Sequence, residues 1–104
     1  MLDFLIAPTK TFMTHRKGSV VDIGFAELTE LLGPPNAPDD GYKVDACWVF
    51  CDADDPGAAF SIWNYKNGPN YTNGEASLDN VLEWSLWYND KGRELAKRVF
   101  GDRL

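Results

Sequence analysis

The sequence predicts an α+β fold in which two helices cover one face of an antiparallel sheet of three to four strands, in the order β-α-β-β-β-α. Apolar residues recur at helical spacing in two segments, residues 22–32 and 91–100. Aromatic and β-branched residues are concentrated in three others, residues 43–51, 58–66 and 80–88. Short connections between consecutive strands favour antiparallel pairing.

The N-terminal part of the chain predicts extended structure followed by a helix. Residues 3–7 and 10–15 are expected to be extended segments separated by Pro8. Asp22 is the expected N-cap of the first helix, and Gly33 is expected to end it. The apolar stripe of this helix consists of Phe25, Leu28, Leu31 and Leu32.

The remaining elements follow from turn residues between apolar segments. Residues 43–51 and 58–66 are expected to form a hairpin, because an Asp-, Pro- and Gly-containing turn lies between them. The third strand, residues 80–88, is followed by Asn89 and Asp90, either of which can cap the last helix. The apolar side of that helix consists of Leu95, Ala96, Val99 and Phe100.

Length and composition predict one globular domain spanning residues 1–104. Hydrophobic residues make up 44% of the chain and charged residues 25%, as in ordinary globular proteins. No segment has the roughly 20 apolar residues of a membrane-spanning helix, so no membrane partner is expected. The N-terminus lacks the basic region and long apolar stretch of a signal peptide, which predicts a cytoplasmic protein.

Charge is distributed unevenly along the chain. The net charge is −6, with −9 in residues 1–90 and +3 in residues 91–104. An acidic body repels phosphate backbones, so general nucleic-acid binding is not expected. The basic residues near the C-terminus are expected to face solvent along the last helix, and a small anion-binding patch is the alternative.

Two cysteines, Cys47 and Cys51, lie four positions apart on one face of a predicted strand. At about 3.4 Å per residue they are about 13 Å apart, beyond the reach of a disulfide. Their spacing matches no common zinc knuckle, so reduced structural thiols are expected.

The period of two along a strand divides the side chains of the sheet between two faces. The first face is almost wholly apolar and is expected to meet the helices, with Trp48 and Trp84 buried. Its members are Val44, Ala46, Trp48, Phe50, Phe60, Ile62, Leu82, Trp84 and Leu86. The second face consists of Lys43, Asp45, Cys47, Val49, Cys51, Ser61, Trp63, Tyr65, Glu83, Ser85 and Trp87.

Three large aromatic residues on the second face, Trp63, Tyr65 and Trp87, predict a binding surface. Because both helices are used on the first face, these side chains are expected to be exposed or covered by something else. Exposed apolar patches usually mark interaction sites, where Trp and Tyr are favoured. Three interpretations stay open: the N-terminal segment or the 67–79 loop covers the face, a second copy covers it in a homodimer, or a foreign partner or ligand binds it.

Charged residues complete the candidate binding set. The full set is Lys43, Asp45, Trp63, Tyr65, Lys66, Glu83 and Trp87. In a complex, Lys43 and Glu83 are expected at the rim, where charges set orientation more than affinity. The alternative to a protein partner is a nucleotide-type ligand that stacks on an aromatic ring and contacts Lys43 or Lys66.

Catalytic and metal-binding patterns are weak. His15 is the one histidine and lies in a polar segment. Asp45 and Glu83 are candidates for paired carboxylates of a small hydrolase, although an ion pair with Lys43 is the preferred interpretation. The acidic turn at residues 52–57 lacks two ligands that a calcium loop needs. No catalytic residue, cofactor or metal is therefore expected.

Several motifs together resemble a family of small, mostly uncharacterised proteins encoded by bacteriophages and other viruses. They are Phe-Ala-Glu-Leu-Thr-Glu-Leu-Leu-Gly-Pro-Pro-Asn (25–36), Tyr-Lys-Val-Asp-Ala-Cys-Trp (42–48), Ile-Trp-Asn-Tyr-Lys-Asn-Gly (62–68) and a Trp-containing strand before a final helix. The sequence departs from that pattern at Cys47, where an acid is usual, and at Asn89-Asp90, where two glycines are usual. The resemblance implies a viral accessory protein that acts by binding in the host cytoplasm. Such proteins block a host enzyme or defence complex, or sequester a signal molecule.

Overall fold

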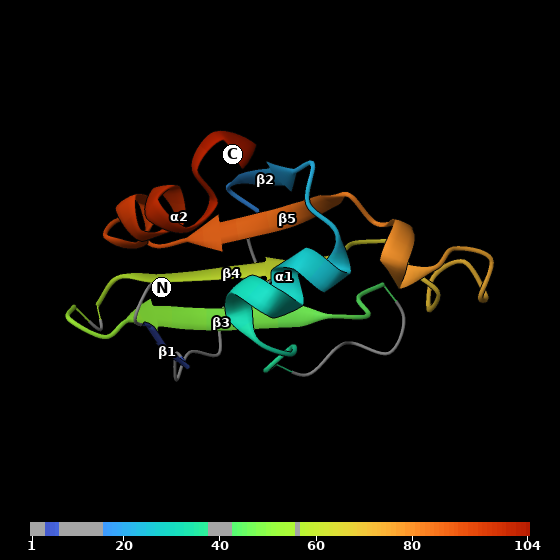
Figure 1. Ribbon diagram of the computed structural model, residues 1–104, viewed down its shortest axis with the longest axis horizontal. Helices are drawn as coiled ribbons and strands as arrows, with labels where there is room; N and C mark the ends of the chain where they lie inside the picture. Colours follow the sequence, from blue (N-terminus) through green and yellow to red (C-terminus); the bar gives the residue numbers. More distant parts are fainter. Residues whose placement is uncertain (1–3, 7–15, 38–42, 56) are drawn as a thin grey trace.

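The computed structural model describes residues 4–6, 16–37, 43–55 and 57–104 of the chain. A five-stranded antiparallel sheet, in the order β1-β3-β4-β5-β2, forms its centre (Figure 1). Two α-helices and two short 3₁₀ helices complete the described structure. The bounds are β1 Phe4–Ile6, β2 Gly18–Val21, α1 Phe25–Leu32, β3 Cys47–Asp52, β4 Ala59–Trp63, η1 Leu78–Asn80, β5 Glu83–Tyr88, α2 Gly92–Phe100 and η2 Gly101–Arg103.

The predicted α+β class with an antiparallel sheet is confirmed, but the sheet has one strand more than expected. β1 lies within the predicted extended segment 3–7, whereas the predicted segment 10–15 lies outside the described residues. β2 was not predicted and pairs with β5 at one edge of the sheet. The described order is therefore β-β-α-β-β-β-α.

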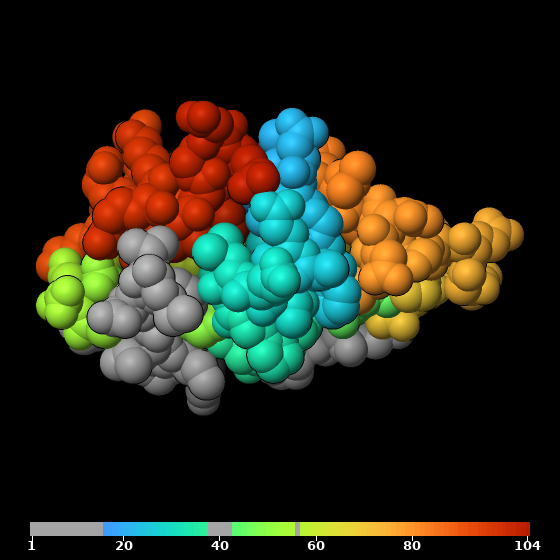
Figure 2. Space-filling view, in the orientation of Figure 1, coloured from blue at the N-terminus to red at the C-terminus, as the bar shows by residue number. Residues whose placement is uncertain are grey.

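Both helices lie on the same face of the sheet, as the periodicity predicted (Figures 1 and 2). The core between them contains the apolar side chains Leu28, Leu32, Trp48, Phe50, Phe60, Ile62, Trp84, Leu86, Leu95, Ala96 and Phe100. Trp48 and Trp84 are fully buried and meet edge to face, with ring centres 5.7 Å apart. Burial of both tryptophans, expected from the sequence, is confirmed.

The two buried indoles also hold both ends of α1. Trp84 Nε1–H donates to the carbonyl oxygen of Ile23, just before the helix, at 2.8 Å. Trp48 Nε1–H donates to the carbonyl oxygen of Gly33, just after it, also at 2.8 Å. Each buried indole N–H therefore has an acceptor, so neither leaves the unpaired polar group that makes aromatic burial costly.

Four details of the predicted elements are wrong. Leu31, expected in the apolar stripe of the first helix, is 39% exposed. Asp22 does not cap α1: it has a left-handed φ of 58°, and the helix starts after Gly24 with no side-chain cap. Val44 packs with the second face of the sheet, and Leu82 is 57% exposed. The cause is the same for both, because β3 begins only at Cys47 and β5 at Glu83, so the alternation of a strand does not extend to 44 or 82.

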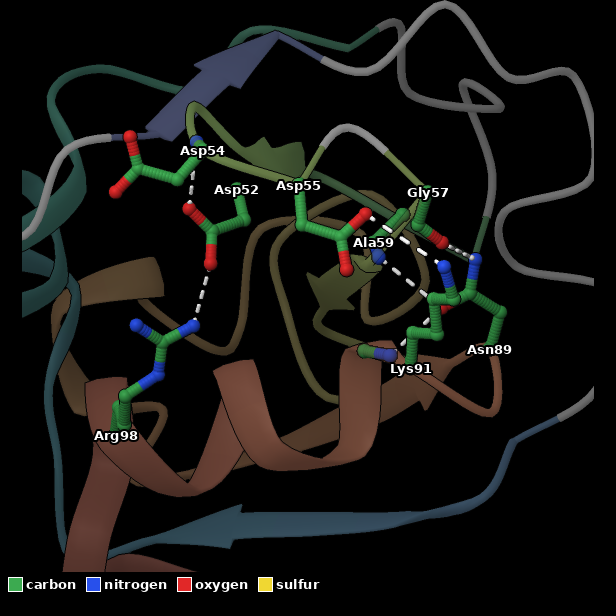
Figure 3. Close-up of polar contacts among 9 residues, drawn as sticks. Asp52, Asp54, Asp55, Gly57, Ala59, Asn89, Lys91 and Arg98 are labelled. Carbon is green, nitrogen blue, oxygen red and sulfur yellow. Dashed lines mark hydrogen bonds and ion pairs between the residues drawn. The ribbon is translucent and has the colours of Figure 1, made fainter.

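The N-cap position of α2 is Lys91, not Asn89 or Asp90 as expected, but Asn89 still bonds the start of the helix (Figure 3). Its Oδ1 accepts the N–H groups of Gly92 at 2.7 Å and Ala59 at 3.0 Å, and its Nδ2 donates to the carbonyl oxygen of Gly57 at 2.7 Å. This amide thus joins the β3–β4 turn to the helix. The junction is tight, since a Cβ on Gly92 would lie 1.8 Å from the carbonyl oxygen of Ala59.

A side-chain amide also continues the pairing of β3. β1 pairs with one end of β3, at residues 50–52. Toward the other end, Asn36 Oδ1 accepts the N–H of Val49 at 2.8 Å, and Nδ2 donates to the Val49 carbonyl at 3.1 Å. Ala37 then bridges to Cys47. Asn36 therefore bonds β3 as a neighbouring strand would, which reduces the unpaired backbone at this edge.

Candidate functional site

The central part of the second face of the sheet, expected to be exposed or covered by something other than the helices, is buried. Its apolar cluster consists of Val44, Cys47, Val49, Cys51, Ala59 and Trp63, with Ala37 and Trp87 packed against it. Trp63 is only 4% exposed and Trp87 is half-buried, whereas Tyr65 is 48% exposed. The expectation that these three aromatic residues form one exposed patch is therefore wrong. A homodimer through this face was expected because exposed indoles would need to be covered. Since Trp63 is buried, that physical reason no longer applies.

The two cysteines of this face are free thiols and both are buried. Burial raises the pKa of the Cys47 thiol to about 12, because a thiolate loses its hydration in an apolar surrounding. A thiol with so high a pKa is not a nucleophile at neutral pH. Cys47 therefore acts as a small apolar side chain that packs beside Trp63.

Asp45 anchors a loop and does not pair with Glu83. Its Oδ2 accepts from Asn64 Nδ2 at 2.8 Å and its Oδ1 from the N–H of Asn70 at 2.9 Å. Asn64 is fully buried, and its Oδ1 accepts the N–H of Asp45 at 2.8 Å. Gly68 lies so close that a Cβ there would be 2.0 Å from Asp45 Oδ2. Asp45 thus holds the loop that follows β4 against the preceding segment.

This anchored loop carries three neighbouring side chains, Tyr65, Lys66 and Tyr71. We call them the Tyr65 corner. Lys66 Nζ lies 5.4 Å from the centre of the Tyr65 ring and 5.6 Å from that of Tyr71, within the range of cation–π attraction. Tyr65 is 48% and Tyr71 37% exposed. Lys66 has a left-handed φ of 61°, which is uncommon outside glycine, and its N–H donates to the Lys43 carbonyl at 2.8 Å.

A small polar cavity adjoins the corner. It has a volume of about 80 Å³ and is lined by Arg16, Tyr65, Asn67, Glu83, Trp84 and Ser85. Arg16 Nη2 lies 4.0 Å from Glu83 Oε1 and also donates to the Ser19 hydroxyl. Asn67 Nδ2 donates to the carbonyl oxygen of Glu83 at 3.3 Å. The cavity holds a few water molecules at most, since each occupies about 30 Å³ in the liquid.

The structure thus divides the seven predicted binding residues. Tyr65, Lys66 and Glu83 lie around the corner and its cavity. Trp63 is buried, Trp87 packs against the buried face, and Asp45 is engaged by the loop. Lys43 is half-buried and contributes its backbone carbonyl to the Lys66 turn. Sequence reasoning missed Tyr71 and Arg16, because Tyr71 lies in a Gly- and Asn-rich loop without periodicity and Arg16 precedes the unpredicted β2.

An acidic turn at the other end of β4 has its own ion pairs (Figure 3). Arg98 Nη2 donates to Asp52 Oδ2 at 2.5 Å, and the N–H of Asp54 donates to Asp52 Oδ1 at 2.9 Å. The hydrogen bond from Arg98 is the main reason that the pKa of the Asp52 carboxyl lies below its usual value, and the bond from the N–H of Asp54 lowers it further. Lys91 Nζ lies 3.7 Å from Asp55. The turn that superficially resembled a calcium loop is therefore joined to α2 by cations of the chain itself.

The lowered pKa of Asp52 predicts how stability depends on pH. The charged carboxylate stabilises the folded state above the unfolded pKa of about 3.9, and this stabilisation is lost as the pH falls through the lower folded pKa. We expect Asp52→Asn to reduce the free energy of unfolding most near pH 7, and the difference from wild type to shrink below about pH 4. Urea unfolding of both proteins at several pH values measures this difference in the free energy of unfolding. Asp54→Asn removes an exposed charge of the same turn and is the control; a pH-independent difference for Asp52→Asn would contradict the prediction.

Two further findings concern metals and membranes. Within the described ranges, no three His, Cys, Asp or Glu side chains gather in a way that could hold a metal ion. None of the helices in the described part of the chain is long and apolar enough to cross a membrane.

Comparisons with known proteins identified no relative. No family model matches the sequence, and no significant match was found among curated proteins or solved structures.

Proposed function

We propose that the chain is a non-enzymatic binding protein that recognises a partner protein through the Tyr65 corner. The observation that carries the proposal is Lys66, which has a left-handed backbone and an ammonium between two exposed tyrosine rings. A non-glycine residue in that conformation costs about 1–3 kcal/mol and is often found at binding sites. Tyrosine is enriched among residues that dominate binding energy at interfaces.

The surroundings of the corner support this role. Exposed large apolar side chains in the described residues are Leu31, Tyr65, Tyr71, Leu82 and Leu104. Three of these five belong to residues 65–82, the segment with η1 that protrudes at one end of the molecule (Figures 1 and 2). Of these, Tyr65 and Tyr71 are linked by the Lys66 ammonium, and contiguous exposed side chains of this kind favour an interaction surface.

The corner is also held in place before any partner arrives. Asn64 and Asn70 bond both carboxylate oxygens of Asp45, and the buried Gly68 packs against that carboxylate. A surface ordered in the free protein loses less conformational entropy on binding than a mobile loop does. This supports recognition of a partner surface by a rigid epitope.

The partner that we propose is a foreign protein in the cytoplasm of a host cell. This follows the resemblance to small viral proteins, some of which block a host enzyme or defence complex. A nucleotide-type ligand fits the corner less well, because Trp63 is buried and the adjoining cavity of about 80 Å³ is too small for a nucleotide. A second copy of the chain is the other outcome to be tested.

The test compares Tyr65→Ser/Tyr71→Ser with wild type. A partner captured from host lysate by the wild type is purified, and its Kd for each variant is measured by calorimetry. We expect the double variant to stay folded and to lose about 30-fold or more in affinity, since an interface residue of the strongest class contributes about 2 kcal/mol or more. The control is Leu31→Ser, another exposed apolar residue, on α1.

Two outcomes would change the assignment. Equal affinities of the wild type and the double variant for the purified partner would contradict binding through the corner. Sedimentation equilibrium that shows a wild-type dimer and a folded monomeric double variant would identify the partner as a second copy.

A further inference from the structure

A second concave surface lies between α2 and the β2 edge of the sheet, away from the Tyr65 corner. This groove has a volume of about 200 Å³. It is lined by Gly18 and Ser19 of β2, Leu86 and Tyr88 of β5, and Arg93 and Lys97 of α2, beside Leu104. We call it the basic groove.

The chemistry of the basic groove is divided between an apolar part and a cationic part. Leu86 is buried and offers little surface, whereas Tyr88 is half-buried, so the apolar part that a ligand would meet is mainly the tyrosine ring. Arg93 and Lys97 are four residues apart on α2 and therefore on the same side of the helix, one turn from each other. Such a surface complements a small molecule that is apolar at one end and anionic at the other.

Their ion pairing distinguishes Arg93 and Lys97 from the other basic residues near the C-terminus. Of the five cations in residues 91–104, three face carboxylates from distant parts of the chain: Lys91 with Asp55, Arg98 with Asp52 and Arg103 with Glu27. Lys97 has only Glu94 of its own helix, at 3.6 Å. Arg93 has no ion pair or hydrogen bond within the part of the chain that the structure describes. In a chain of net charge −6, two adjacent cations without long-range partners are therefore left at a groove.

We propose that the basic groove binds a small organic phosphate, with its ring or aliphatic part on the Tyr88 ring and its phosphate between Arg93 and Lys97. A phosphate monoester carries close to two negative charges at pH 7, which matches two cations better than a carboxylate does. A volume of about 200 Å³ is below the roughly 300–1,000 Å³ of drug-sized sites, which limits the ligand to about one ring and one charged group. This site is independent of the proposed function, because none of the residues of the Tyr65 corner lines it.

Phenyl phosphate is the probe, and ¹H–¹⁵N NMR of the full chain is the measurement. We expect saturable shifts at the amides of Ser19, Tyr88, Arg93 and Lys97, with a Kd of about 1 mM or below. Phenol has only the ring, and inorganic phosphate has only the charged group. Each is therefore expected to bind at least about tenfold more weakly than phenyl phosphate.

A matched pair of variants tests the role of charge. Arg93→Gln and Lys91→Gln each remove one positive charge at the start of the last helix, but only Arg93 lines the basic groove. We expect Arg93→Gln to weaken phenyl phosphate at least about fivefold and Lys91→Gln less than about twofold. Absence of saturable shifts at the groove, equal effects of the two variants, or equally tight binding of inorganic phosphate would each overturn the proposal.

Discussion

Replacing Trp48 by alanine is expected to lower the free energy of unfolding by about 3–5 kcal/mol. The side chain is fully buried, packs edge to face on Trp84 and donates to the Gly33 carbonyl at the end of α1. Truncation would create a cavity and leave that carbonyl without its donor. Because a domain of this size has about 5–15 kcal/mol in total, little folded protein is expected at the low end of that range.

Urea unfolding followed by circular dichroism measures the effect, as the change in midpoint at constant slope. Tyr65→Ala is the control, since it also truncates an aromatic side chain but one that is half exposed. Surface changes of this kind usually shift stability by no more than about 0.5 kcal/mol. An unchanged midpoint for Trp48→Ala would show that the helix-covered face has been assigned wrongly.

Gly92→Ala is expected to destabilise the fold although alanine is a far better helix former. At an ordinary helix position the change would stabilise by about 1 kcal/mol. Here the new Cβ would lie 1.8 Å from the carbonyl oxygen and 2.7 Å from the carbonyl carbon of Ala59. These are backbone atoms of β4, and Asn89 binds the N–H of the same residue, so they cannot move without disturbing the junction. Overpacking costs about 1–3 kcal/mol or more, so the steric cost exceeds the gain in propensity.

Thermal unfolding of the variants checks this result. Gly18→Ala is the control because a Cβ there meets no atom within 4 Å. We expect Gly92→Ala to lower the Tm by several degrees, at about 4–8 °C per kcal/mol for a domain of this size, and Gly18→Ala to change it little. A Gly92→Ala protein as stable as wild type would mean that the α2–β4 junction is looser than described.

The fold was largely predictable because local periodicity decides it. The two helices, the three consecutive strands and the helix-covered face all follow from spacings of two and 3.6 residues. β2 could not be found in this way, since its four residues show no alternation and it is a strand by virtue of its pairing with the distant β5. Val44 and Leu82 were misplaced for a related reason: the pattern does not show where a strand begins.

The candidate site was less predictable than the fold. Counting helices suggested an uncovered second face, but irregular segments such as that of Ala37 also cover sheets, and they have no periodic signal. The left-handed conformation falls on Lys66 itself and not on the adjacent Asn67 or Gly68, the residue types that usually adopt it. Its conformation is set by non-local bonds, among them the N–H of Lys66 to the carbonyl of Lys43.

The motifs that suggested the resemblance to small viral proteins include residues that hold the fold. Asn36 pairs with β3, and Asp45, Asn64 and Gly68 form the anchor of the loop after β4. Such residues are constrained by geometry whatever the protein binds. These motifs therefore concern the scaffold, whereas the Tyr65 corner is distinguished by its exposure and backbone conformation.

The attachment of α1 at both ends has a consequence for how the protein opens. A helix of eight residues is too short to persist alone, since isolated helices need roughly 12–15 residues. The carbonyls on either side of it accept from the indoles of Trp84 and Trp48, which form the centre of the core. Detachment of the whole of α1 from the sheet must therefore break the bonds to both tryptophans. The helix is therefore expected to open together with the sheet, and its hydrogen-bonded amide hydrogens, from Leu28 onward, are expected to exchange with solvent only through global unfolding.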